Sequence, residues 1–87
     1  MANHKSAAKR ARQSESRRER NRWWRARLRT AIKEFRTALE AGDAEKVAGL
    51  LPKTLGLVDR TARAGVIHTN SASRYKSRLQ LAVNKLG

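Results

Sequence analysis

The sequence predicts an all-α protein: a three-helix antiparallel bundle from which a long, basic N-terminal helix projects. Three observations support this prediction. Apolar residues recur three and four positions apart in three segments, two glycine-containing breaks separate those segments, and the first segment extends far beyond its apolar stripe as a basic run. A chain of 87 residues is the size of one small domain, and we take residues 1–87 as a single unit.

The first helix is expected over residues 5–41, with a basic arm over residues 3–29. At 1.5 Å per residue such a helix spans roughly 55 Å, and partner helices of this chain can cover only about half of it. The helix face that is apolar from Trp24 onward carries polar and basic residues before it: Asn21, Arg17, Ser14 and Arg10. The N-terminal half is therefore expected to project as a rod. The stripe itself consists of Trp24, Leu28, Ile32, Phe35 and Leu39, with Ala31 and Ala38 beside them.

Like charges four residues apart oppose helix formation in an isolated segment. Arg18 with Arg22, and Glu15 with Glu19, are such pairs. We therefore expect the basic arm to be frayed when free and to become ordered on binding.

The second helix is expected over residues 44–64. Gly42 suits the left-handed position after the first helix, and Asp43 suits the N-cap of the second. Pro52 has two interpretations: a kink within this helix, or a break with Pro52 in the first turn of a new helix. The expected stripe consists of Val47, Leu51, Leu55, Val58 and Ala62, with Leu50 on its flank.

The third helix is expected over residues 70–85. Gly65 again suits the position after a helix end, and Thr69 or Asn70 is the expected N-cap. The apolar stripe predicts that Tyr75 lies in the core with its hydroxyl at the edge. Its full membership is Ala72, Tyr75, Leu79, Ala82 or Val83, and Leu86.

Charge is the strongest indication of function. The chain carries a net charge of +14, and residues 5–29 hold eleven Lys or Arg against two acids. Such a basic excess predicts a polyanionic partner. Arg outnumbers Lys, and the planar guanidinium both pairs with phosphate and stacks on bases, which favours folded RNA. Arg25 and Arg29 belong to this run and are candidate contacts.

The residues that most enzymes need are missing or scattered. The chain has no Cys, and its two histidines, His4 and His68, lie far apart in sequence without neighbouring acids. We therefore predict no enzymatic activity, no metal site, no cofactor and no small-molecule substrate. His68 is expected to contact a phosphate or to cap local backbone. No apolar run is long enough to cross a bilayer, and the basic arm lacks the apolar face of a membrane-surface helix.

Two further features suggest RNA contact. The third helix offers a second basic surface through Arg74 and Arg78, and its serines Ser71, Ser73 and Ser77 allow close approach of a backbone; a solvated polar face is the alternative. Trp24 lies on the apolar stripe and is expected in the core. Trp23 lies at the rim, where it would stack on a base or an Arg, or cover the end of the bundle.

Several segments, in one register over nearly the whole chain, resemble the bacterial small-subunit ribosomal protein S20 family. They are Met1–Arg10, Arg17-Arg18, Arg20–Arg22, Leu28–Lys33, Gly65–Asn70, and then Ala72, Arg74 and Lys76–Leu79. The sequence departs from the family pattern at Thr69 and Tyr75, where Lys or Arg is usual, and at Trp23-Trp24, where small or basic residues are usual.

The resemblance implies a structural constituent of the 30S subunit that binds 16S ribosomal RNA directly and stabilises its folding during assembly. It implies a cytoplasmic ribosome, with an organellar one left open, contact with other small-subunit components, and no homo-oligomer. A histone-like, architectural nucleic-acid-binding protein is the alternative. The contact candidates that the resemblance implies are Lys5, Ser6, Lys9, Arg10, Arg17, Arg18, Asn21, Arg22, His68, Asn70, Arg74, Lys76, Ser77 and Arg78.

Overall fold

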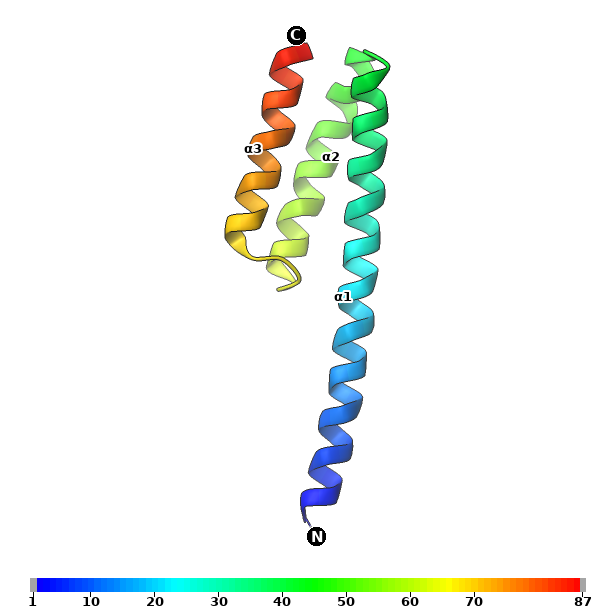
Figure 1. The fold of residues 1–87 in the computed structure, drawn as a ribbon, viewed down its shortest axis with the longest axis vertical. Helices are drawn as coiled ribbons and strands as arrows, with labels where there is room; N and C mark the ends of the chain where they lie inside the picture. Colours follow the sequence, from blue (N-terminus) through cyan, green and yellow to red (C-terminus); the bar gives the residue numbers. More distant parts are fainter. Residues whose placement is uncertain (1, 87) are drawn as a thin grey trace.

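The computed structural model describes the backbone of residues 2–86 and the side chains of residues 6–86. This part of the chain folds into three helices: α1 (Ala2–Glu40), α2 (Ala44–Arg63) and α3 (Thr69–Leu86). In Figure 1, α1 and α3 run in the same direction and α2 runs in the opposite direction. The predicted three-helix antiparallel bundle with a projecting first helix is confirmed.

The molecule is elongated because α1 extends well past its partners. The described part of the chain measures 64 × 21 × 15 Å, and the N-terminal half of α1 has no other helix beside it in Figure 1. Every side chain from Ser6 to Arg20 is exposed. We call residues 2–22 the rod. The rod is helical from Ala2, three residues before the predicted start.

The core begins where the apolar stripe of α1 meets the other two helices. Phe35 and Val58 are fully buried at its centre, and Trp24 is partly buried against its edge. The stripe predicted for α1 therefore does face the core. The buried apolar set is Leu28, Phe35 and Ala38 of α1, Val47, Leu57 and Val58 of α2, and Ala72 and Leu79 of α3.

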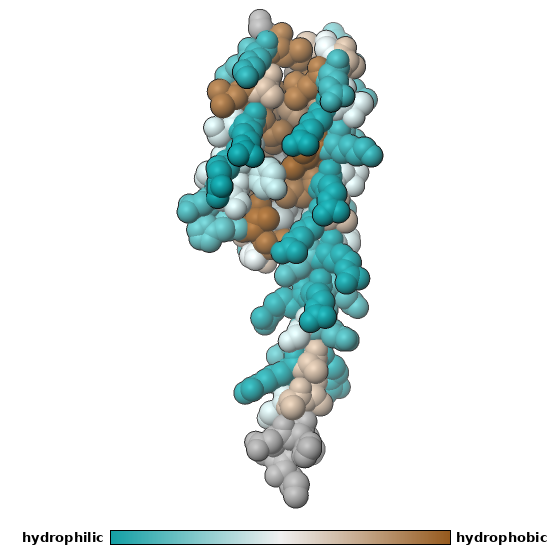
Figure 2. All heavy atoms as spheres, viewed as in Figure 1, coloured by the Kyte–Doolittle hydropathy of each residue, from teal (hydrophilic) through white to brown (hydrophobic). Residues whose placement is uncertain are grey.

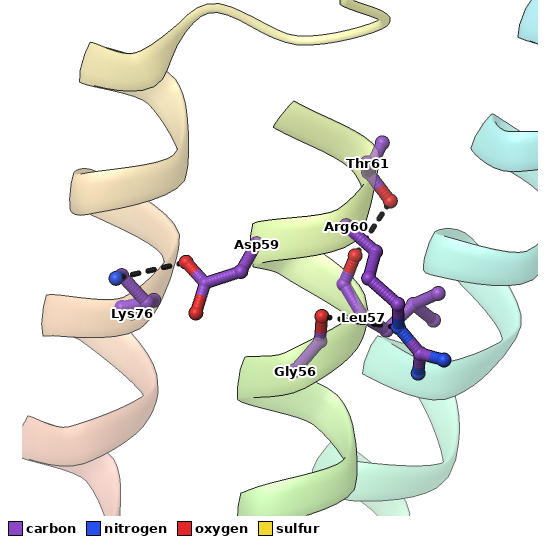
Figure 3. A network of polar contacts seen from close by, with 6 residues as sticks. All are labelled: Gly56, Leu57, Asp59, Arg60, Thr61 and Lys76. Carbon is purple, nitrogen blue, oxygen red and sulfur yellow. Dashed lines mark hydrogen bonds and ion pairs between the residues drawn. The ribbon is translucent and has the colours of Figure 1, made fainter. Parts of the chain in front are cut away.

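The buried face of α2 is wider than the predicted stripe. Thr54, Leu57 and Thr61 are buried although the stripe did not include them, while Leu51 and Leu55 are only partly buried. The reason is that α2 packs against both other helices, which touch each other least, so it buries two sides. The threonines tolerate burial because each hydroxyl donates to the carbonyl four residues earlier, at 2.9 Å and 2.7 Å, as Figure 3 shows for Thr61.

Pro52 lies inside α2, which continues unbroken from Ala44 to Arg63. The interpretation of Pro52 as the start of a new helix is therefore wrong. Pro52 is exposed, and its ring needs no space in the core. The helix loses the one backbone donor that a proline lacks, and packing of α2 on both neighbours offsets that loss.

Glycines end the first two helices in the same way. Gly42 and Gly65 adopt positive φ angles of 68° and 79°. At each end the glycine N–H and the next N–H donate back to carbonyls of the last helical turn, at 2.9–3.2 Å, which is the Schellman arrangement. Asp43 then caps α2, because its carboxylate accepts from the Lys46 N–H at 3.2 Å. The predicted roles of Gly42, Asp43 and Gly65 are confirmed.

Candidate nucleic-acid interface

One row of cations runs along α1 from the rod into the bundle. Its six members are spaced four, three, four, four and three residues apart, which keeps them on one side of a helix. They are Arg18, Arg22, Arg25, Arg29, Lys33 and Arg36, and all six are exposed. We call this set the cation row.

Among the described side chains, no carboxylate forms an ion pair with the cation row. Among the side chains described, from Ser6 to Leu86, the one ion pair within 4.0 Å joins Lys76 to Asp59. Glu15 and Glu19, which the sequence places three residues before Arg18 and Arg22, thus make no ion pair with them in this range. The field around the row therefore remains strongly positive and attracts anions.

The cation row lines two hollows that meet at Arg25 and Arg29. The first, of about 380 Å³, lies on the rod side and is also lined by Arg18, Asn21, Arg22 and Ala26. The second is a groove of about 710 Å³ between α1 and α3, lined by Arg25, Leu28, Arg29, Ile32, Lys33, Arg36, Thr37, Glu40, Ile67 and Tyr75. We call it the α1–α3 groove. An anionic strand could therefore follow one continuous basic path from rod to bundle.

The α1–α3 groove exists because α1 and α3 contact each other least of the three helix pairs. In Figure 2, an apolar strip lies between two rows of hydrophilic side chains on this face. The apolar residues lining the groove are Leu28, Ile32 and Ile67. Ile32 and Ile67 are partly buried against the core, so the floor of the groove is the edge of the core itself.

Tyr75 of α3 lines the groove opposite α1, and the basic residues of α3 adjoin the groove at Tyr75. Arg74 and Arg78 lie one turn apart and line a small hollow of about 160 Å³ together with Ser71 and Tyr75. Tyr75 thus lines both this hollow and the α1–α3 groove. Its side chain is 36% exposed, so the prediction that Tyr75 lies in the core is wrong. The stripe places Tyr75 toward α1, but α1 is too far away to cover it.

His68 caps α3. Its Nδ1 accepts a hydrogen bond from the Asn70 N–H at 3.0 Å, and its carbonyl accepts from the Ala72 N–H at 3.0 Å. The expected N-cap at Thr69 or Asn70 is therefore wrong, since α3 begins at Thr69. The expectation that His68 caps local backbone is confirmed. With Nδ1 acting as acceptor, the neutral ring carries its proton on Nε2, and that N–H can donate to an anion.

Lys76 has a partner within the protein. Its Nζ lies 2.9 Å from Asp59 Oδ1, which links α3 to α2, as Figure 3 shows. Both side chains are well exposed, so the pair adds little to stability. The ammonium of Lys76 nevertheless faces an internal carboxylate, and it adds less net charge to the surface than Arg74 or Arg78.

The two tryptophans differ in exposure. Trp23 is 51% exposed, whereas Trp24 is partly buried and packs on the core. Their rings meet edge to face with centroids 4.8 Å apart, and the Arg27 guanidinium lies 4.6 Å above the Trp23 ring. Of the roles expected for Trp23, stacking on an arginine is the one that the structure shows.

Within the described residues, no three His, Asp or Glu side chains gather where they could hold a metal ion. None of the three helices, over the same residues, is both long enough and apolar enough to cross a membrane.

Comparison with known proteins decides the family. A family model described as ribosomal protein S20 matches residues 2–84. The chain belongs to the ribosomal protein S20 family. It is thus a ribosomal protein of the small subunit, a structural component and not an enzyme.

Bacterial S20 proteins match this chain over all or nearly all of its length. The small ribosomal subunit protein bS20 of Mycobacterium sp. (strain JLS) is 51% identical over 86 residues, which cover 99% of this chain and 100% of that protein. The bS20 of Nitrosomonas eutropha is 48% identical over 87 residues, covering all of both chains. The bS20 of Koribacter versatilis is 49% identical over 83 residues, covering 95% of this chain and 93% of the relative.

The predicted contact residues of this S20-family chain fall into three groups. Those on the rod are exposed along its length: Ser6, Lys9, Arg10, Arg17, Arg18 and Arg22, with Asn21 partly buried. The side chain of Lys5 lies outside the described residues. Arg25 and Arg29 join the rod to the groove, and Arg74 and Arg78 face the small hollow on α3. His68 and Asn70 are exposed at the start of α3, and Ser77 is exposed in the middle of that helix.

Sequence reasoning missed three residues of this surface. Lys33 and Arg36 continue the cation row into the S20-family bundle, and Tyr75 forms part of the groove wall. The spacing of Arg29, Lys33 and Arg36 was a usable signal, because steps of four and three keep them on one helix face. No spacing pattern in the sequence indicated that Tyr75 is exposed, because its exposure depends on the gap between α1 and α3.

Proposed function

We propose that this chain binds 16S ribosomal RNA directly and stabilises the folded RNA during assembly of the 30S subunit. The observation that carries the proposal is the uninterrupted cation row, which continues from a fully exposed rod into the groove of a folded bundle. At 1.5 Å per residue the row from Arg18 to Arg36 extends for roughly 27 Å. That length suits several successive phosphates rather than one small anion.

The two parts of the molecule have different tasks in this proposal. The rod enters the RNA and neutralises phosphates that converge around it, because cations lie on all its sides. The bundle fixes the direction of the rod and adds Arg74 and Arg78 as a second set of contacts. The protein acts as a single copy, since a net charge of +14 disfavours self-association, and it meets other small-subunit components beside the RNA.

Salt dependence of binding tests the phosphate contacts. If about six phosphates are contacted, affinity for folded 16S ribosomal RNA falls about a thousandfold between 50 and 200 mM monovalent salt, by the relation established for B-DNA. Replacing Arg25 and Arg29 together by Gln should lower the slope of log affinity against log salt by about two. The matched control replaces Lys53 and Arg60 by Gln, because these exposed cations lie on α2 and line none of the hollows described above.

Competition separates RNA recognition from general attraction to polyanions. Unlabelled 16S ribosomal RNA should displace the labelled RNA from the protein far better than duplex DNA of equal nucleotide concentration at one fixed salt. Equal displacement by the duplex would favour a histone-like, architectural protein and would contradict the proposed function.

A further inference from the structure

The α1–α3 groove contains more than phosphate binding requires. The rod-side hollow is lined by arginines, Asn21 and Ala26, whereas the groove adds Leu28, Ile32, Ile67 and Tyr75. A ribose-phosphate backbone needs cations and hydrogen-bond donors but gains nothing from an apolar floor. The combination of a basic rim and an apolar, partly aromatic interior fits a ligand that is anionic at its edges and apolar at its centre.

Tyr75 lies where such a ligand would be held. Its side chain is 36% exposed, and it lines both the groove and the small hollow that contains Arg74 and Arg78. Arg25 and Arg29 line the facing wall on α1. Tyr75 thus lies between two sets of arginines: Arg25 and Arg29 across the groove, and Arg74 and Arg78 in the adjoining small hollow.

We propose that the α1–α3 groove holds an unpaired RNA base, which stacks on Tyr75 above the apolar floor. The phosphates on either side of that nucleotide contact Arg25 and Arg29 on the α1 wall of the groove, and Arg74 and Arg78 in the adjoining small hollow. This proposal rests on the proposed function and adds a specific site to it. Aromatic side chains stack bases of any sequence, and a groove of about 710 Å³ lies in the size range of small-ligand sites.

The continuity of the cation row favours RNA over an acidic protein helix. An amphipathic acidic helix would match the floor and rim of the groove, but not the rod. Residues 6–20 of the rod have no apolar side chain larger than alanine, and the cation row passes from the rod into the groove through Arg25 and Arg29 without interruption. A single RNA strand satisfies both segments, with its phosphates on the row and one base turned into the groove.

The test compares salt titrations of full-length variants on folded 16S ribosomal RNA. Tyr75→Leu should lower affinity by roughly 5- to 150-fold, the range for loss of one stacked base. The loss should be the same at every salt concentration, because stacking displaces no counterions from phosphate. Tyr75→Phe keeps the ring and should retain most of the affinity. Ultraviolet crosslinking of the wild-type complex, followed by mass spectrometry, should give a nucleotide adduct on Tyr75.

The matched control is Leu81→Ala, because Leu81 is an apolar residue of α3 that is 56% exposed and lines neither the groove nor the small hollow. Its affinity should equal that of the wild type. Unchanged affinity of Tyr75→Leu, with an unchanged melting temperature, would overturn the groove site and leave the proposed function intact; this is also the result if the groove holds an acidic protein segment. Failure of the wild type to bind the RNA would instead refute the proposed function.

Discussion

The rod and the bundle share one helix, but different forces maintain that helix in its two halves. From Ser6 to Arg20 every side chain is exposed, so helix formation there depends on local propensity and is opposed by repulsion between like charges. From Leu28 to Ala38 the same helix buries its apolar side against α2 and α3, and tertiary packing stabilises it. The positive charge is thus concentrated in the half of the helix that packs against no core, and the packed bundle supplies the rigidity that the rod lacks.

The sharpest test of this contrast is removal of the central core residue. Phe35 is fully buried, so Phe35→Ala should lower the free energy of unfolding by roughly 3–5 kcal/mol. A bundle of this size has only marginal stability, and we expect the variant to be largely unfolded near room temperature. Chemical denaturation followed by circular dichroism at 222 nm measures the change. A loss below about 1 kcal/mol would contradict the burial seen at Phe35.

Removing rod charges should have the opposite outcome. Replacing Arg17 and Arg18 together by Ala should weaken binding to 16S ribosomal RNA and lower the salt slope by about two, while the melting temperature stays within error of the wild type. Both side chains are exposed, and neither packs on the bundle. A fall in melting temperature as large as that of Phe35→Ala would refute the separation of rod from bundle.

Two glycines of the bundle allow a paired test of backbone conformation. Gly65 has a φ of 79°, where an L-residue is strained, so Gly65→Ala should destabilise the fold by roughly 1–2 kcal/mol. Gly49 lies inside α2 with open space around an added Cβ, so Gly49→Ala should stabilise it by roughly 0.5–1 kcal/mol. Thermal unfolding of both variants measures the two signs. If both variants shift the melting temperature the same way, the conformational argument at Gly65 fails.

The smallest effect is expected for the rod alone. A peptide of residues 1–22 should be only partly helical in low-salt buffer, because nothing packs against it and its like charges repel. Addition of an RNA polyanion should increase its helicity. Full helicity without any polyanion, measured by circular dichroism, would show that local propensity suffices and that the arm is ordered before binding.

Much of the fold followed from apolar spacing, because periodicity reports which side of a helix is buried. Trp24, Leu28 and Phe35 faced the core as expected, and Gly42 and Gly65 ended helices as expected. Periodicity does not report how far apart two helices lie. The exposure of Tyr75 depends on that distance, which is set by packing of both helices on α2.

Two further errors have local causes. The predicted stripe of α2 contains only apolar residues and omits Thr54 and Thr61, yet each hydroxyl forms a hydrogen bond within its own helix, so both residues can be buried. The N-cap of α3 was assigned to residues with common capping side chains, and His68 performs this role with a ring nitrogen instead. The outline of the charged surface was predicted, because locating charged residues on a helix requires no knowledge of how the helices pack. The path of that surface into the groove was not predicted, because it depends on packing.

The two glycine-ended connections also affect how quickly the bundle forms. Within residues 2–86, the segments between helices are the short stretches 41–43 and 64–68, so each helix packs mainly on its neighbour in sequence and most native contacts are local. Small helical proteins with such low contact order fold in microseconds to milliseconds. The bundle would therefore be complete well before a large RNA finishes folding, and the rod would meet the RNA as a segment already attached to a finished anchor.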